Sequence, residues 1–97
     1  MADIFGILAD MNSYLALKKV MRKRKIFTYD NKKFCADKAP VYDGYIETAI
    51  ALCNENDEFD SDNIYYQDTT NKSLELCIEE FKEMYDKCNG NLEKVYL

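Results

Sequence analysis

The sequence predicts a small α+β fold in which residues 1–97 form a single domain. We expect the element order α-β-β-α-β-α-β, with three helices packed against a small, mostly antiparallel sheet. Apolar residues make up 47% of the chain, which is enough for one core. They recur at helical spacing in three segments, and short runs rich in β-branched and aromatic residues lie between these segments. A mostly α-helical chain, with the strand-like runs as loops, is the alternative.

The first predicted helix covers residues 3–24. Asp3 can cap its N-terminus by accepting a backbone N–H. Apolar residues recur on one face across residues 4–15, and basic residues gather at the C-terminal end, where the helix dipole favours them. Further apolar residues lie on other faces, so this helix is either deeply buried or broken near residues 12–13.

A short β-hairpin is expected over residues 25–35. Its β-branched and aromatic residues flank Asp30 and Asn31, two residue types that tolerate the positive φ angles of a tight turn. Residues 36–40 should form a loop, because Pro40 disfavours a helix just before it.

The second predicted helix begins at Asp43 as its N-cap and ends near Asn54. Its apolar residues lie mostly on one side. The acidic segment 55–62 has no periodicity and is expected to be a solvated loop. Residues 63–67 then resemble a strand of moderate strength.

The third predicted helix, residues 71–88, has the clearest pattern in the chain. Residues 68–71 offer several N-caps, and Gly90 is the expected left-handed terminator. Residues 92–97 could add a last short strand. Charged residues separate the members of an apolar stripe, which should face the core: Leu74, Cys77, Ile78, Phe81, Met84, Tyr85 and Cys88.

Charge is distributed unevenly along the chain. Residues 1–34 carry eight Lys or Arg and three Asp or Glu, a net charge of +5, whereas residues 35–97 carry a net charge of −10. The protein is therefore an electrostatic dipole unless folding brings the two parts together.

The residue types of a conventional enzyme site are mostly missing, so we expect no catalytic site. The chain has no His, which is the commonest general base and metal ligand. Its three glycines form no phosphate-binding loop. No two of the four cysteines form a CxxC pair, so we expect no metal and no cofactor, and we expect buried thiols at Cys35, Cys53, Cys77 and Cys88.

The acidic residues of the loop and of the third helix are candidates for a partner-binding face. The loop lacks the glycine and the bidentate Glu of a calcium-binding EF-hand, so plain solvation is the competing interpretation. Carboxylates on the third helix could imitate a run of phosphates or dock on a basic groove. The candidate residues are Glu55, Asp57, Glu58, Asp60, Asp62, Glu75, Glu79, Glu80 and Glu83.

A basic cluster precedes the predicted hairpin and is a candidate for contact with nucleic acid. Aromatic residues nearby could stack on bases. Against this, the whole protein is acidic, and these charges could instead be solvated, pair with the acidic half of the chain or contact a protein partner. The cluster consists of Lys18, Lys19, Arg22, Lys23, Arg24 and Lys25.

These observations favour a small acidic non-enzymatic binding protein that acts through protein–protein contact. The expected partner is a protein with a basic surface, and a nucleic-acid-associated regulator using residues 18–25 is the alternative. Lys outnumbers Arg eleven to two, which is typical of A+T-rich genomes and suggests a phage or mobile-element inhibitor of a host nucleic-acid-handling or defence enzyme. We see no signal peptide or membrane helix, so we expect a cytoplasmic protein.

Overall fold

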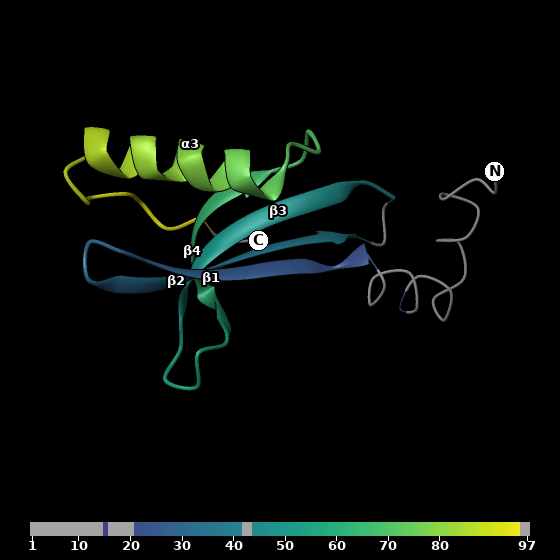
Figure 1. Cartoon of the computed structure of the whole chain (residues 1–97), viewed down its shortest axis with the longest axis horizontal. Coiled ribbons are helices and arrows are strands. Elements are labelled where there is room, and N and C mark those ends of the chain that lie inside the picture. Colours follow the sequence, from purple (N-terminus) through teal and green to yellow (C-terminus); the bar gives the residue numbers. More distant parts are fainter. Residues whose placement is uncertain (1–14, 16–20, 42–43, 96–97) are drawn as a thin grey trace.

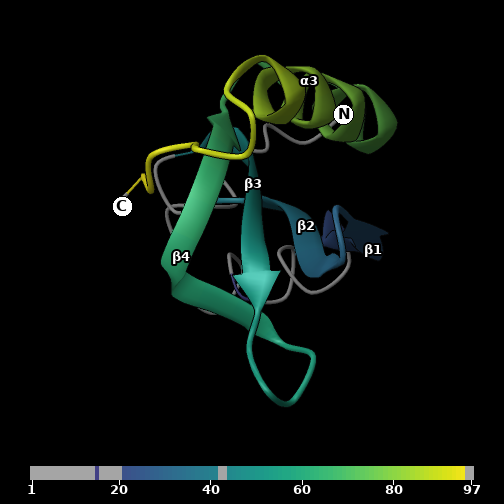
Figure 2. The ribbon, with the colours of Figure 1, turned by 90° about the vertical axis from the view of Figure 1, so that its left-hand side faces the viewer.

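The structure is a computed structural model that describes residues 15, 21–41 and 44–95. The elements in the described residues are β1 (Lys23–Tyr29), β2 (Lys32–Pro40), β3 (Ile46–Cys53), β4 (Phe59–Asp68) and α3 (Leu74–Lys87). The four strands form one antiparallel sheet in the order β1-β2-β3-β4 (Figure 2). The helix α3 lies over one face of this sheet (Figure 1). The predicted order α-β-β-α-β-α-β, with three helices against the sheet, is therefore wrong.

The predicted second helix is wrong, because its apolar run forms the strand β3. This strand pairs with β2 on one side and with β4 on the other. Ile50 packs toward α3, whereas Ala49 and Ala51 belong to the cluster on the opposite face of the sheet. A strand buried on both faces is a continuous apolar run, and periodicity cannot separate it from a short buried helix.

Residues 36–40, predicted as a loop, form the second half of β2. Ala36 pairs with Ile50, and Pro40 pairs with Ile46. The register between β1 and β2 ends at Lys38, so no β1 residue pairs with Pro40. Proline is tolerated here because it needs no N–H toward β1.

The β-hairpin is confirmed, and it is longer than predicted. Asp30 and Asn31 form its two-residue turn with φ angles of 52° and 59°, which define a type I′ turn. The strand β1 begins at Lys23, so the predicted first helix extends too far at its C-terminal end. Leu15 and Met21 are helical, and the rest of that prediction, residues 3–14 and 16–20, lies outside the described residues.

The predicted acidic loop is shorter than expected, because β4 begins within it. The side-chain oxygen of Asn54 accepts the backbone N–H groups of Asn56 and Glu58, at 2.9 and 3.0 Å. This closes a turn in which Asp57 adopts a positive φ of 59°. The strand predicted over residues 63–67 is confirmed as part of β4.

The third predicted helix is confirmed as α3, which is shorter than the predicted range 71–88, and none of the cap candidates at residues 68–71 is its N-cap. Its N-cap is Ser73, whose hydroxyl accepts the N–H of Leu76 at 3.2 Å. At the C-terminus the N–H of Gly90 donates to the carbonyl of Tyr85, and the N–H of Asn89 donates to that of Asp86. This is a Schellman motif in which Asn89 is the first residue with a positive φ. Gly90, the predicted left-handed terminator, follows it and also has a positive φ of 80°. The last predicted strand is reduced to a bridge between Ile64 and Val95, and residues 96–97 lie outside the described residues.

The main core lies between α3 and the sheet. Its centre is aromatic: the rings of Phe34 and Phe81 are 4.9 Å apart, and Phe34 also stacks with Phe27 at 5.6 Å. Two members of the predicted stripe are not core residues. The side chain of Met84 is 43% exposed, and Cys88 is also exposed at the end of α3.

Candidate functional site

The candidate acidic residues lie on two separate surfaces. Those of α3 are above the sheet in Figure 1, whereas the turn between β3 and β4 projects from the opposite side, and Figure 2 shows the same separation. The structure therefore does not bring the acidic loop and the acidic helix together, and each surface must be assessed by itself.

Two of the five loop carboxylates are engaged inside the loop or with a neighbouring strand. Asp57 forms an ion pair with Lys33 at 3.0 Å. Asp60 accepts the side-chain amide of Asn63 at 2.6 Å and the N–H of Asp62 at 3.0 Å, and these bonds lower the pKa of Asp60. They shape the turn and the start of β4. The remaining carboxylates, those of Glu55, Glu58 and Asp62, are exposed.

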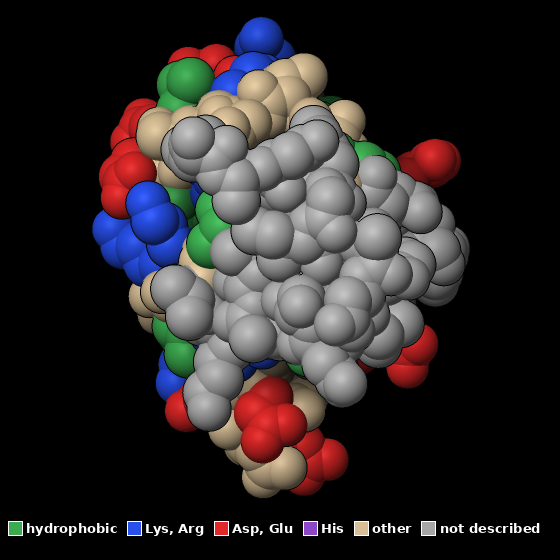
Figure 3. Space-filling view, turned by 90° about the vertical axis from the view of Figure 1, so that its right-hand side faces the viewer, with side chains coloured by type: hydrophobic (Ala, Val, Ile, Leu, Met, Phe, Trp, Pro, Cys, Tyr) green, Lys and Arg blue, Asp and Glu red, His purple; other side chains and the backbone are tan. Residues whose placement is uncertain are grey.

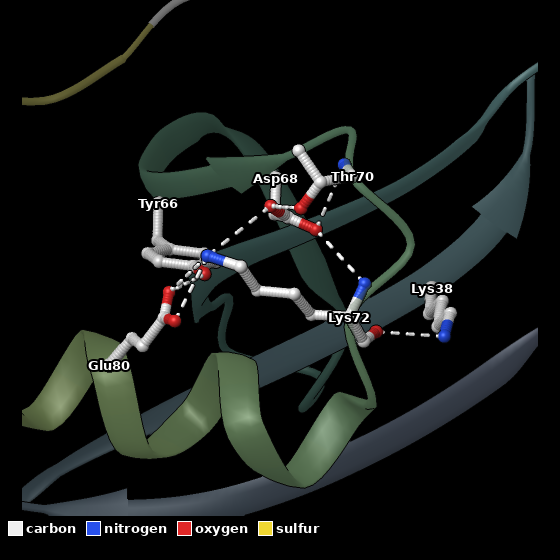
Figure 4. Close-up of polar contacts among 6 residues, drawn as sticks. All are labelled: Lys38, Tyr66, Asp68, Thr70, Lys72 and Glu80. Carbon is white, nitrogen blue, oxygen red and sulfur yellow. Dashed lines mark hydrogen bonds and ion pairs between the residues drawn. The ribbon is translucent and has the colours of Figure 1, made fainter.

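Glu80 belongs to a polar network under α3 (Figure 4). Its carboxylate accepts the ammonium of Lys72 at 2.9 and 3.0 Å and the hydroxyl of Tyr66 at 2.8 Å. The bond with Lys72, followed by the bond with Tyr66, lowers the pKa of Glu80. Burial raises the pKa of Tyr66, and the adjacent Cys77 and Glu80 raise it further. Glu80 thus ties α3 to β4 and to the segment before the helix.

Asp68 anchors the same network at the end of β4. Its carboxylate accepts the hydroxyl and the N–H of Thr70, at 2.7 and 3.2 Å, and the N–H of Lys72 at 3.4 Å (Figure 4). Lys38 adds a bond to the carbonyl of Lys72 at 2.8 Å. Burial tends to raise the pKa of Asp68, but the hydrogen bonds from Thr70 and Lys72 outweigh it and the pKa is lowered. The network holds the connection that positions the N-terminus of α3.

The other three candidate helix residues form a row on the outside of α3. Glu75, Glu79 and Glu83 are exposed and follow one another every four residues, about 6 Å apart along the helix axis. No Lys or Arg in the described residues forms an ion pair with any of them. Two large apolar residues are exposed near the row: Leu76, 47% exposed, lies beside it, and Met84, 43% exposed, lies about 100° farther around the helix from Glu83. We call these five residues the outer face of α3.

The candidate basic cluster is only partly described, since Lys18 and Lys19 lie outside the described residues. Arg22 makes a bidentate contact with Asp37, at 2.8 and 3.0 Å, and Arg24 approaches the same carboxylate at 3.5 Å. The hydrogen bond with Asp37 raises the pKa of Arg22. Lys23 and Lys25 are exposed, and neither forms an ion pair with a described carboxylate.

Positive and negative side chains are intermixed on the side of the molecule shown in Figure 3. Lys and Arg side chains gather along one rim, with Asp and Glu side chains beside and below them. Folding therefore brings some side chains of the basic part of the sequence next to side chains of the acidic part. The pairing of two arginines with Asp37, which belongs to the acidic half of the chain, shows one such contact.

A hollow of about 500 Å³ lies where the β1–β2 turn meets the C-terminus of α3. Two Tyr-Asp dipeptides meet beside it, and the tyrosine of each donates a hydrogen bond to the aspartate of the other. The hydroxyl of Tyr29 donates to Asp86 at 2.6 and 2.7 Å, and the hydroxyl of Tyr85 donates to Asp30 at 2.6 Å. This exchange fastens the tip of the hairpin to the last turn of α3. The residues lining the hollow are Tyr29, Asp30, Tyr85, Asp86, Asn89 and Gly90.

Two lysines lie against the tyrosines of the hollow. Lys32 donates to the Tyr85 hydroxyl at 2.8 Å, and Lys82 lies 5.4 Å from the centre of the Tyr29 ring. The hydrogen bond with Asp86 raises the pKa of Tyr29, and the bond with Tyr85 raises the pKa of Lys32. Both groups therefore stay protonated near neutral pH, and what they supply in this hollow is hydrogen-bond donation and charge balance.

The hollow was not predicted, because its two halves are 55 residues apart in the sequence. The only sequence signal is the repeated Tyr-Asp dipeptide, at 29–30 and 85–86. The same dipeptide occurs at 42–43, beyond the described residues, so the repeat by itself does not identify the contact.

The Tyr85→Phe variant is expected to lower the free energy of unfolding by about 1–2 kcal/mol, because Asp30 and Lys32 lose their shared partner. The control is Tyr65→Phe, which removes a hydroxyl with no hydrogen bond to a described residue. It should change stability by less than about 0.5 kcal/mol. Urea denaturation measures both, and equal losses would show that the exchange does not stabilise the fold.

The four cysteines are free thiols. Cys35 and Cys77 are buried as predicted, Cys53 is half-buried, and the prediction of burial is wrong for Cys88, which is exposed. Burial raises the pKa of the Cys35 and Cys53 thiols. No group of three or more metal-binding side chains forms among the described residues. Over the same residues, no helix has the length and apolar character needed to cross a membrane.

The described fold is of the α+β type, a four-stranded antiparallel meander with one face covered by α3, and its most distinctive surface is the outer face of that helix. Comparisons with protein-family models, curated proteins and solved structures find no match for this chain. Its function must therefore be inferred from the site alone.

Proposed function

We propose that the chain is a binding protein that contacts a basic surface of another protein through the outer face of α3. The observation that carries this proposal is the row of Glu75, Glu79 and Glu83, three exposed carboxylates without a described cationic partner. The exposed Leu76 lies beside this row, and the exposed Met84 borders it on the side toward the sheet. Charges and apolar groups thus share one surface.

The two kinds of side chain suit different steps of association. Like charges four residues apart on a helix repel one another slightly, so the row is not explained by helix stability. Carboxylates steer a basic partner toward the helix and set the orientation of the complex. Leu76 and Met84 can then be buried against the partner and lose their hydration. The unbranched Met84 side chain adapts to irregular surfaces.

A nucleic-acid-handling protein is the class of partner that this row fits best. Such proteins have basic grooves that accept a line of phosphates. The carboxylates of the row are about 6 Å apart along the axis, so they present a regular line of negative charge on a rigid element. Occupying such a groove would inhibit the partner, as expected of a phage or mobile-element inhibitor.

The alternative, nucleic-acid contact through residues 18–25, has weaker support. Arg22 and Arg24 share Asp37, which offsets part of their charge. Of the described residues in the cluster, only Lys23 and Lys25 remain for phosphates. Exposed carboxylates elsewhere on this acidic protein also oppose the approach of nucleic acid.

Replacing all three glutamates of the row by lysine should weaken binding strongly. We expect the Glu75→Lys/Glu79→Lys/Glu83→Lys variant to bind the partner at least about 100-fold more weakly, a loss near 3 kcal/mol. The immobilised wild-type chain first captures its partner from lysate at about 50 mM salt, where ionic contacts persist. Mass spectrometry identifies the captured protein, and calorimetry measures its affinity for each variant.

A matched control distinguishes the effect of where the charges lie from the effect of the total charge of the protein. The Glu55→Lys/Glu58→Lys/Asp62→Lys variant makes the same change in net charge on the opposite side of the sheet. It should bind within about threefold of the wild type, since only long-range attraction changes. Equal weakening by the two variants, with both folded by circular dichroism, would contradict a specific role for α3.

A further inference from the structure

The strand β1 forms an open outer edge of the sheet (Figure 2). In the described residues its only strand partner is β2. Residues 23–26 and Thr28 are exposed, so this edge is accessible along most of its length. An accessible edge carries unpaired backbone N–H and C=O groups, which can pair with a further strand.

The turn of the hairpin determines which backbone groups face outward. In a two-residue type I′ hairpin, the residues that flank the turn exchange backbone hydrogen bonds, and such pairs alternate along the ladder. The flanking pair is Tyr29 and Lys32. The backbone groups of Tyr29, Phe27 and Lys25 therefore point toward β2. Those of Thr28, Ile26 and Arg24 point away from the sheet.

The side chains along this edge indicate what kind of strand would pair with it. Lys25 lies on the same face of the sheet as Phe27, which packs against the core under α3, and Lys23 lies two residues before it on that face. On the other face Ile26 is 44% exposed, and Arg24 shares Asp37 with Arg22. The edge thus presents two lysines without a described ionic partner on one face and an uncovered apolar side chain on the other.

We propose that the β1 edge binds an extended acidic segment of another protein, which adds a fifth strand to the sheet. Side chains of a strand alternate between its two faces. Acidic residues at every second position would lie beside Lys23 and Lys25, and apolar residues between them would cover Ile26. Backbone bonds to Arg24, Ile26 and Thr28 would supply the affinity, as in other complexes formed by strand addition. This inference is independent of the proposed function, because it uses a different surface and a partner of opposite charge.

A second copy of β1 fits this edge poorly. Antiparallel self-pairing would bring Lys23, Arg24 and Lys25 of both chains, six basic side chains, into one two-stranded ladder. Asp37 is the one carboxylate that the described structure places in ion pairs with residues of this edge. Lysines on edge strands oppose such self-association. The charges that exclude a second copy favour an acidic strand.

The test uses a defined peptide, an acetylated and amidated eight-residue segment that alternates Glu with Val. We expect saturable binding in fluorescence anisotropy and slowed amide hydrogen exchange at Arg24, Ile26 and Thr28. The Lys23→Glu/Lys25→Glu variant should bind at least about tenfold more weakly. Its substitutions are at exposed positions, so the fold should persist, and circular dichroism checks this.

The decisive control is the same peptide with N-methyl groups on alternate residues, prepared in both registers. N-methylation keeps the charge but removes the N–H groups that would pair with β1, so one register should bind at least about tenfold more weakly. Equal binding of both N-methylated peptides would overturn the proposal, because attraction would then be ionic only. Two further results would overturn it as well. One is self-association of the chain, measured by sedimentation. The other is displacement of the peptide by a short single-stranded oligonucleotide at a lower concentration than unlabelled peptide requires.

Discussion

The Phe81→Ala variant is expected to lose about 4 kcal/mol of unfolding free energy, within the usual range for truncating a buried phenylalanine. The Phe81 side chain is fully buried. Its ring lies 4.9 Å from that of Phe34 and 6.0 Å from that of Phe27, so it joins α3 to β1 and β2. Truncation would leave a cavity at the centre of the core, where neighbouring strands cannot close in without breaking their ladders.

The matched control for this substitution is Met84→Ala on the same helix. The sequence assigns Met84 to the apolar stripe with Phe81, whereas its side chain is 43% exposed in the structure. Its truncation should cost less than about 1 kcal/mol. Urea denaturation with a constant m-value measures both changes. Similar losses for the two variants would show that the side of α3 facing the sheet has been misassigned.

The Asp68→Ala variant is expected to lose about 2 kcal/mol, because three hydrogen bonds to a charged, buried acceptor are removed and their partly buried donors lose that partner. The side chain of Asp68 is 7% exposed, and it accepts hydrogen bonds from Thr70 and from the N–H of Lys72. These bonds order the segment that leads into α3. The control is Asp62→Ala, because the Asp62 side chain is exposed and accepts no hydrogen bond from a described residue.

The same residue should make stability depend on pH. The folded-state pKa of Asp68 is lowered from its ordinary value of 3.8, because its hydrogen bonds outweigh burial, and the pKa of Glu80 is lowered from 4.5 by Lys72 and then Tyr66. A lowered folded pKa gives stability that is complete above the ordinary value and is lost as pH falls through the folded value.

Urea midpoints measured from pH 6 to pH 2 should therefore fall below about pH 4.5 for the wild type. The Asp68→Asn/Glu80→Gln variant should be less stable at pH 6 and should lose less stability on acidification. Parallel profiles for the two proteins would contradict the stabilising role of these carboxylates.

The elements predicted correctly are those whose signals are local. Asp30 and Asn31 adopt the positive φ angles that suit their short polar side chains, so the hairpin follows from two neighbouring residues. The helix α3 follows from its own 3.6-residue pattern over 14 residues. Neither depends on where distant segments lie.

The errors come from elements whose burial is decided by the rest of the fold. Residues 49–53 are apolar on both faces because β3 lies between β2 and β4 with packed side chains on each side, so the alternation of a strand is absent there. Pro40 indicates a loop when the sequence is taken alone, yet it fits in β2 because the register of β1 ends before it. Strand neighbours of this kind are not visible in a local window of sequence.

Only part of the candidate site could be predicted, because only part of it depends on local helical spacing. Helical spacing places Glu75, Glu79 and Glu83 in one row, and the structure has them in that row. The pairing of Glu80 with Lys72 and Tyr66 depends on how α3 sits on β4, so spacing could not reveal it. The Tyr-Asp exchange at the hollow likewise requires the hairpin to reach the end of α3.

Mapping the bound surface tests the role of the outer face of α3 most directly. The isotopically labelled chain is titrated with the protein that it captures, and amide chemical shifts are followed by nuclear magnetic resonance. We predict that the largest changes fall on residues 75–84 of α3 and vanish with the Glu75→Lys/Glu79→Lys/Glu83→Lys variant. Changes centred on β1 or on the acidic turn at residues 55–62, with α3 unaffected, would contradict the proposal.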